Sequence, residues 1–236
     1  MTTGTPLRVF IGYDSKEPIA FAVLAHSIIS RVTCPVTITP IARQGLGGWY
    51  WRERGPTEST EFSLTRFLVP ALSEFRGYSL FLDCDMLCRV DLGLVMQEVN
   101  RQPDKAVWVC KHDYAPRSGA KFLGQTQTAY PRKNWSSFVL WNNARCARLT
   151  PSYVNRASGL DLHRFTWLGS EEEDIGGLPL EWNWLVGEYP PNPNAKILHF
   201  TRGGPWFDET KDCDHAADWV TERQAMDHAA MSVMLP

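Results

Sequence analysis

The sequence predicts an α/β fold, with a central, mostly parallel, twisted sheet flanked by helices, in one domain over residues 1–236. Short apolar runs of strand-like composition alternate with longer runs of helical spacing, which is the order typical of a parallel sheet. No linker, internal repeat or low-complexity tract divides the chain. Its 236 residues, 44% of them hydrophobic, suffice for one well-packed core and are few for two.

The first elements are clear. The apolar run Leu7–Ile11 predicts a strand, and a polar turn leads to a helix over 18–30 that begins with proline, a residue suited to the first helical turn. A second strand is predicted over 36–41. A loop over 44–59 follows, dense in glycine, arginine and aromatic residues.

Residues 62–75 favour a helix that Pro70 bends or interrupts. Further strands are predicted at 78–82, 106–110, 137–141 and 196–200, and an amphipathic C-terminal helix at 214–231. In sheets of this kind ligands bind outside the carboxyl ends of the strands. Residues that directly follow a strand are therefore the first functional candidates, and Tyr13 and Asp14 are the earliest of them.

The strand at 78–82 ends on two carboxylates, Asp83 and Asp85. Because side chains alternate along an extended chain, both point to one face while Cys84 points to the other. Two like charges at the end of a buried strand are costly unless a cation lies between them. Oxygen ligands suit Mg²⁺ or Mn²⁺, whose remaining positions are often filled by substrate phosphates. The pattern favours a metal-dependent enzyme, while a strand ending in a polar turn is the structural alternative.

A third candidate ligand is His199, which ends the run 196–200 just before a glycine-rich turn. Imidazole suits Mn²⁺ better than Mg²⁺. A single histidine is more often structural, but its position at a strand end matches that of the two aspartates. We therefore expect His199 to complete their site.

Composition excludes several other classes. A net charge of −2 gives no basis for binding nucleic acid or an anionic membrane, and no apolar run approaches the roughly 20 residues that span a bilayer. The N-terminus lacks the basic and apolar regions of a signal peptide. The six cysteines show no metal-binding or disulfide spacing, so buried free thiols are expected. These observations predict a cytoplasmic protein without a transmembrane segment.

Six motifs stand in one order along nearly the whole chain. They are Phe10–Ser15, Ser63–Pro70, Phe81–Asp85, Asn134–Asn142, Leu178–Asn183 and His199–Trp206. In this order they resemble the motifs of the GT-A glycosyltransferases of the family-8 type, which includes glycogenin-like enzymes and bacterial galactosyl- and glucosyltransferases. The resemblance implies a single GT-A domain, with a nucleotide-binding half over about 1–110 and a sugar- and acceptor-binding half over about 111–236.

The resemblance also implies an activity. A hexose would pass from a nucleoside-diphosphate sugar, most often UDP-glucose or UDP-galactose, to a hydroxyl of a glycan or other acceptor, with retention of configuration. Asp83, Asp85 and His199 would hold Mn²⁺, or Mg²⁺, against the diphosphate, and Tyr13 and Asp14 would contact the base. Further donor contacts are expected from Arg66, Lys133, Ser137, Asn142, Arg202, Gly204 and Trp206. The catalytic carboxylate that orients the sugar is expected among Glu172, Glu173 and Asp174.

Two departures from the family pattern are visible. Gly204 stands where the family has a diphosphate-binding lysine, so Arg202 or Lys133 is the candidate to supply that charge. The acidic run at 171–174 replaces an Asp-Gln motif, so the member that faces the sugar is left open.

Other interpretations stay open at this point. The fold and metal site also fit a sugar-phosphate nucleotidyltransferase, although the turn after the first strand lacks the glycine-rich basic loop of that class. A non-catalytic nucleotide- or carbohydrate-binding module is the other alternative. Trp135, Trp182 and Trp184 fit a carbohydrate-stacking platform or the core. The aromatic and basic segment 49–54 fits a mobile loop that closes over the donor better than a nucleic-acid patch.

Overall fold

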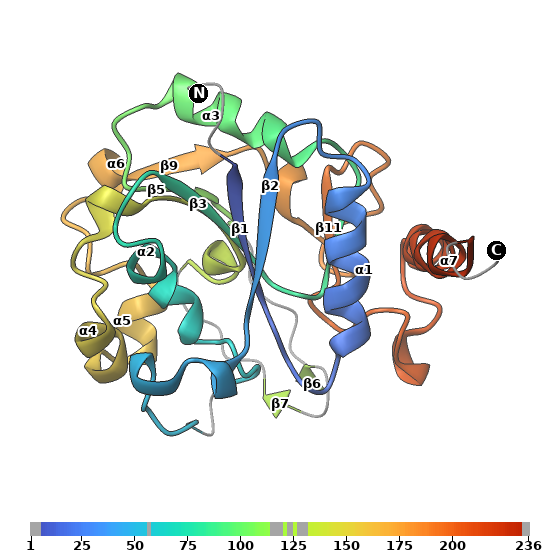
Figure 1. The fold of residues 1–236 in the computed structure, drawn as a ribbon, viewed down its shortest axis with the longest axis horizontal. Helices are drawn as coiled ribbons and strands as arrows, with labels where there is room; N and C mark the ends of the chain where they lie inside the picture. Colours follow the sequence, from blue (N-terminus) through green and yellow to red (C-terminus); the bar gives the residue numbers. More distant parts are fainter. Residues whose placement is uncertain (1–5, 56–57, 114–119, 122–124, 127–131, 233–236) are drawn as a thin grey trace.

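A six-stranded sheet forms the centre of the computed structural model, which describes residues 6–55, 58–113, 120–121, 125–126 and 132–232 (Figure 1). The strand order is β2-β1-β3-β8-β5-β9. β8 runs antiparallel to β3 and β5, and every other pair in this sheet is parallel. The prediction of a mostly parallel sheet is therefore confirmed. The strands are β1 (Leu7–Gly12), β2 (Val36–Ile41), β3 (Tyr78–Leu82), β5 (Val107–Cys110), β8 (Phe138–Asn142) and β9 (Ile175–Leu178).

Two smaller sheets accompany it. The order β10-β11-β4 joins segments far apart in the sequence, and β6 and β7 form a two-stranded pair. Only three residues, 83–85, separate β3 from β4, so the chain leaves one sheet and enters the other across the two aspartates. The strands are β4 (Met86–Cys88), β6 (Ala120–Lys121), β7 (Gln125–Thr126), β10 (Trp184–Leu185) and β11 (Ile197–His199).

Helices cover both sides of the main sheet. In Figure 1, α1 lies to the right of β1 and β2, while α2, α4 and α5 gather to their left. The α-helices are α1 (Pro18–Ile29), α2 (Val69–Leu72), α3 (Met96–Arg101), α4 (Pro151–Arg156), α5 (Gly159–His163), α6 (Glu171–Asp174) and α7 (Ala216–Ser232). The 3₁₀ turns are η1 (Arg43–Gly45), η2 (Gly47–Trp49), η3 (Thr65–Leu68), η4 (Leu92–Val95), η6 (Trp135–Ser137), η7 (Asn143–Cys146), η8 (Leu180–Asn183) and η9 (Asp208–Thr210).

Pro70 explains why the expected helix over 62–75 is short. The chain forms the 3₁₀ turn η3 and restarts as α2, with the proline in the first turn of α2, where its missing N–H has no partner to lose. α1 and α7 lie close to their predicted ranges. The N-caps of α4, α5 and α6 are Thr150, Ser158 and Ser170, whose hydroxyls accept hydrogen bonds from backbone N–H groups of the first turn.

Two apolar clusters hold these layers together. The larger contains the side chains of β1, β3, β5 and β8, with Leu24 and Ile28 of α1 packed on them. The smaller lies around β11 and includes Val23 of α1 together with Trp219 of α7. α1 therefore packs both on the main sheet and on the three-stranded sheet that contains β11. All six cysteines are free thiols, four of them buried, which confirms that expectation.

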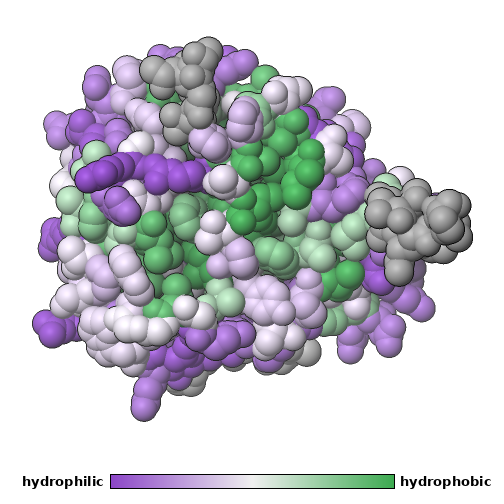
Figure 2. Space-filling model, in the orientation of Figure 1, coloured by the Kyte–Doolittle hydropathy of each residue, from purple (hydrophilic) through white to green (hydrophobic). Residues whose placement is uncertain are grey.

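Figure 2 shows a prominent apolar area on this face near the upper end of α1, the helix whose last residue, Ile29, is 61% exposed. β1 and β2 end at the opposite edge of the sheet. Within the described ranges, no helix combines the length and apolar character needed to cross a bilayer.

Candidate metal centre and donor site

Asp83 and Asp85 occupy the turn between β3 and β4, and the backbone fixes this turn on both sides. The Asp83 N–H donates to the Ser137 carbonyl at the start of β8 (2.9 Å), and the Phe200 N–H donates to the Asp85 carbonyl (2.8 Å). Cys84 points the other way and is fully buried. The alternation predicted from the sequence is therefore present, with both carboxylates on one side.

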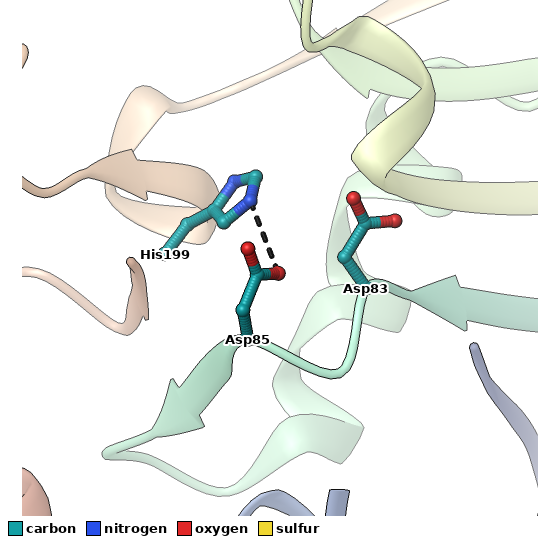
Figure 3. A group of neighbouring side chains, drawn as sticks. All are labelled: Asp83, Asp85 and His199. Atoms are coloured by element: carbon teal, nitrogen blue, oxygen red, sulfur yellow. Dashed lines mark ion pairs between the residues drawn. The ribbon is translucent and has the colours of Figure 1, made fainter. Parts of the chain in front are cut away.

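The third side chain, His199, lies on β11 of the three-stranded sheet. β11 pairs with β4 so that His199 lies opposite Met86, the residue after Asp85. Figure 3 shows the side chains of Asp83 and Asp85 from the β3–β4 turn and of His199 from β11 converging on one another. One ligand atom from each lies within 4.8 Å of the other two. The structure thus brings together the three residues that the sequence nominated as metal ligands.

Asn183 sets the tautomer of the neutral His199 ring. Its side-chain nitrogen lies 2.9 Å from the Ser137 hydroxyl and 3.3 Å from the Asn134 carbonyl, which is an acceptor only. The side-chain oxygen of Asn183 must then face His199 Nδ1, 2.9 Å away, so Nδ1 carries the proton in the neutral ring. The remaining nitrogen, Nε2, presents its lone pair to Asp85, 3.3 Å distant.

This arrangement fits a divalent cation. A neutral imidazole lone pair aimed at a carboxylate is repulsive unless a proton or a metal ion lies between them. His199 is 2% exposed and the second carboxylate lies within the same 4.8 Å group. One nitrogen and two carboxylates form a donor set that Mn²⁺ accepts readily and Mg²⁺ accepts through its oxygens.

Arg66 lies directly beside this group. It is 5% exposed, and its guanidinium is 2.7 Å from an Asp83 oxygen, where it also donates to the Ser136 carbonyl (2.9 Å). The rings of Phe62 and Phe81 flank the guanidinium at 5.3 and 5.0 Å. Arg66 therefore holds Asp83 in place and brings a positive charge to the site, as the prediction of a donor-facing cation requires.

Glu17, just before α1, is a buried carboxyl that the sequence did not single out. It is 5% exposed and accepts a hydrogen bond from the Cys84 thiol (3.5 Å). Burial, and then the charge of Asp85, raise the pKa of Glu17 to about 8. Glu17 thus lies behind the two-aspartate turn as a largely protonated acid near neutral pH.

His112 is the second buried group that only the structure reveals. It follows β5 by two residues and its Nδ1 lies 2.9 Å from the Tyr189 hydroxyl. Burial, and then the neighbouring His199, lower the pKa of His112 to about 3, so this imidazole stays neutral.

Tyr13 and Asp14 follow β1 at the same edge of the sheet, where the base-binding segment was expected. The Tyr13 ring is half-buried and meets Phe21 edge-on at 5.7 Å. Asp14 is 3% exposed, and its two oxygens accept the backbone N–H groups of Lys16 (3.0 Å) and Glu61 (3.1 Å). Asp14 therefore ties the turn after β1 to the segment that leads into η3.

Ser137 and Asn142 end up at opposite edges of the sheet. Ser137 precedes β8, and its hydroxyl donates to the Asn134 carbonyl (2.7 Å) next to the metal centre. Because β8 is antiparallel to β3, Asn142 pairs with Tyr78, five residues before Asp83. That separation is roughly 16 Å along the strand. The expectation that Asn142 contacts the sugar together with Ser137 does not agree with this register.

The glycine-rich turn after β11 contains three further residues that were expected to contact the donor. A Cβ built on Gly204 would lie 2.0 Å from Trp206 Cζ3, so the position accepts no side chain. Trp206 packs against Phe200 and Trp219, with ring centroids 5.8 and 5.1 Å away. Arg202 forms an ion pair with Glu188 (2.9 Å) rather than remaining available to a phosphate. Lys133 is 6% exposed and precedes Asn134.

The acidic candidates Glu172, Glu173 and Asp174 lie away from the metal centre. Register places Ile175, the residue after them, at the level of Ser79, through the pairs Ile175–Val107, Val107–Trp141 and Trp141–Ser79. Asp174 is then at the level of Tyr78, five residues and three strand spacings from Asp83. These correspond to roughly 16 Å along and 14 Å across the sheet, so the structure does not bring these carboxylates to the site.

Glu171, the first residue of the same run, has different contacts. It forms ion pairs with Arg132 and with Lys111 (3.5 Å), the residue that follows β5. Both cations lie over the Trp135 ring at 5.6 Å. Among these acidic residues, Glu171 is the one tied to the carboxyl edge of the sheet.

The tryptophans expected as a stacking platform are mainly core. Trp135 is 7% exposed and Trp182 is fully buried, whereas Trp184 is half-buried. Trp49 and Trp51 are the exposed ones, at 43% and 55%.

One known protein is similar over most of the sequence. Protein CDI of Arabidopsis thaliana is 46% identical over 229 residues, which cover 93% of this chain and 86% of that protein. No protein-family model matches the chain.

Solved glycosyltransferase structures share the fold. Apo WbbM, a bifunctional glycosyltransferase, matches 94% of this chain with a TM-score of 0.63 and 15% identity. Apo GlyE of Streptococcus pneumoniae TIGR4 matches 98% with a TM-score of 0.60 and 13% identity. The chain spans 50% of the WbbM chain and 64% of the GlyE chain, less than two thirds of either. At these identities the likeness concerns the fold alone, and that fold is the GT-A fold.

Proposed function

The chain belongs to the same family as Protein CDI of Arabidopsis thaliana, and we propose that it is a metal-dependent glycosyltransferase. The observation that carries this proposal is the convergence of Asp83, Asp85 and His199 in a GT-A fold, outside the carboxyl end of β3. We further propose a family-8 type of enzyme that moves a hexose from UDP-glucose or UDP-galactose to a glycan or other hydroxyl, with retention, in the cytoplasm.

The chemistry requires expulsion of a nucleoside diphosphate while the anomeric carbon gains positive charge. Asp83, Asp85 and His199 would hold Mn²⁺, or Mg²⁺, which neutralises the departing diphosphate when bound. Asn183 keeps the His199 Nε2 lone pair available for this role. Arg66 holds Asp83 in place and adds a fixed positive charge in a site sheltered from water.

Other residues are proposed to contribute position rather than charge. We propose that Tyr13 and Asp14 contact the base and that Ser137, which is hydrogen-bonded to Asn183, contacts the sugar. Lys133 and the turn over 202–206 remain proposed donor contacts, with the charge of Arg202 already countered by Glu188. We assign no catalytic step to Glu172, Glu173 or Asp174, since the register of β9 keeps them at a distance.

The test is release of nucleoside diphosphate from a panel of sugar nucleotides with Mn²⁺, Mg²⁺ or EDTA. We expect one UDP-hexose to turn over with Mn²⁺, and Asp85→Asn to lower turnover at least 100-fold because one metal ligand loses its charge. Asp174→Asn is the matched control and should retain wild-type turnover. Tight binding of a sugar nucleotide without turnover, with any acceptor, would instead identify a binding module.

A further inference from the structure

A cavity lies beside the segment that Asp14 anchors through the Glu61 N–H. It has a volume of about 420 Å³ and is lined by Arg43, Gln44, Gly47, Tyr50, Arg54 and Glu61. These residues come from the loop after β2 and from the approach to η3, and they contribute nothing to the three-residue metal centre.

Neither arginine of this cavity forms a direct ion pair in the described part of the chain, although the carboxylate of Glu61 also lines the cavity. Among the described residues, no carboxylate lies within ion-pair distance of Arg43 or Arg54, in contrast to Arg66 and Arg202, which pair with Asp83 and Glu188. Backbone carbonyls hold both side chains instead. Arg43 donates to the Arg52 carbonyl (2.6 Å), and Arg54 donates to the Glu58 carbonyl (3.1 Å). Two fixed guanidinium groups in one cavity repel each other until an anion enters.

Tyr50 provides an independent indication of a ligand. The residue is 7% exposed, and its hydroxyl is a buried polar atom without a hydrogen-bond partner. A buried hydroxyl without a hydrogen-bond partner is unfavourable for the folded protein. Its ring lies under Arg43 at 5.5 Å, and burial, then the charge of Glu58, raise its pKa, so the phenol remains a donor at neutral pH. Tyr50, Arg43 and Arg54 therefore lie together in the wall of one cavity.

The segment that carries these residues is held rigidly. Asn155 of α4 donates to the Trp49 carbonyl (3.0 Å) and accepts the N–H groups of Trp51 (2.8 Å) and Arg52 (3.0 Å). The segment is thus a fixed wall, and the expectation of a loop that moves over the donor has no support in these contacts. On the same wall, Trp49 and Trp51 expose their indoles, which suit the apolar faces of sugars.

We propose that this cavity is an anion-binding site, separate from the metal centre, that receives a phosphate or carboxylate group carried by a sugar substrate. That the bound sugar is a substrate rests on the proposed function, whereas the binding of an anion to this cavity does not. The cavity is much larger than a phosphate ion, so it has room for the monosaccharide to which the anion is attached. Glu61, whose oxygen accepts from Ser15, also lines the cavity and can accept hydrogen bonds from sugar hydroxyls.

The experiment is calorimetric titration of the full chain in EDTA with inorganic phosphate, glucose 6-phosphate, glucuronate and, as a comparison, uncharged glucose and UMP. We expect binding of glucose 6-phosphate or glucuronate, at least tenfold tighter than glucose, and at least a tenfold loss in Arg43→Gln and Arg54→Gln. Arg145→Gln, which removes an exposed arginine elsewhere, is the control. The phosphate and carboxylate arms distinguish the two sources of the anion.

Tyr50→Phe guards against variants that merely misfold. It removes only an unsatisfied hydroxyl, so the urea midpoint should stay equal or rise while the affinity for the anionic sugar falls. No binding of either anionic sugar, or equal binding by all variants, would overturn the proposal. Binding of UMP alone, lost in the same variants, would also overturn it, because the cavity would then serve the donor nucleotide. Since EDTA removes metal, none of these outcomes depends on whether the enzyme transfers sugar.

Discussion

Replacing Asn183 by alanine tests how the metal centre is built, because this side chain contacts His199 but is not one of the three proposed metal ligands. It is fully buried and makes hydrogen bonds to His199 Nδ1 (2.9 Å), the Ser137 hydroxyl (2.9 Å) and the Asn134 carbonyl (3.3 Å). In the variant the His199 ring has no partner to fix its tautomer or its plane. We expect Mn²⁺ affinity to fall 10- to 100-fold, which corresponds to about 1.4–2.7 kcal/mol.

Loss of three buried hydrogen bonds also lowers the free energy of unfolding, by about 2–4 kcal/mol. Urea unfolding should therefore accompany the binding assay, to confirm that the variant is folded under its conditions. Mn²⁺ binding is followed by electron paramagnetic resonance of the free ion. Asn142→Ala provides the matched control, because that asparagine lies at the far end of β8 and should leave Mn²⁺ affinity unchanged. A folded Asn183→Ala protein with wild-type Mn²⁺ affinity would refute the orienting role.

Three further predictions concern single positions. Glu17 keeps its proton up to about pH 8 in the folded protein but loses it near pH 4.5 in the unfolded chain. Between these pH values Glu17 therefore lowers the free energy of unfolding as pH rises, by about 1.4 kcal/mol per pH unit. Glu17→Gln should accordingly gain stability over wild type between pH 5 and pH 8 in urea titrations, and a constant difference would contradict the raised pKa. Gly204→Ala should lower the free energy of unfolding by about 1–3 kcal/mol or more in the same assay, because the new Cβ would meet Trp206. Gly177→Ala should lower it far less, because there is open space around that position. Glu172→Gln should keep sugar-nucleotide turnover within about twofold of wild type, because distant charges act weakly across solvent; a 100-fold loss would show that this segment reaches the reacting sugar.

The sequence was informative where local chemistry decides structure. Short apolar runs located β1, β2, β3, β5, β8 and β11, and the alternation of an extended chain placed Asp83 and Asp85 on one side. A polar residue at a strand end is recognisable because the edge of a parallel sheet is where ligands bind. For that reason His199 could be joined to the aspartates before the pairing of β11 with β4 was known.

The sequence could not reveal strand direction, and this explains the main error. An apolar run such as β8 reads the same whether it is parallel or antiparallel, yet the direction decides that Ser137 lies at the site and Asn142 does not. The charge balance of side chains is equally hidden. Arg202 forms an ion pair with Glu188, whereas Arg43 has no carboxylate within ion-pair distance among the residues that the structure describes, and residues from other segments decide both outcomes. β4 and β9 were missed because they are short and, in β9, contain two glycines.

The most direct test of the central claim is anomalous diffraction at the manganese edge from crystals grown with Mn²⁺ and UDP. The account predicts one strong peak within bonding distance of an Asp85 oxygen and of His199 Nε2, with the UDP phosphates beside it. Bound UDP with no metal at Asp85 and His199, or manganese bound only elsewhere, would contradict the assignment of this cluster as the metal centre.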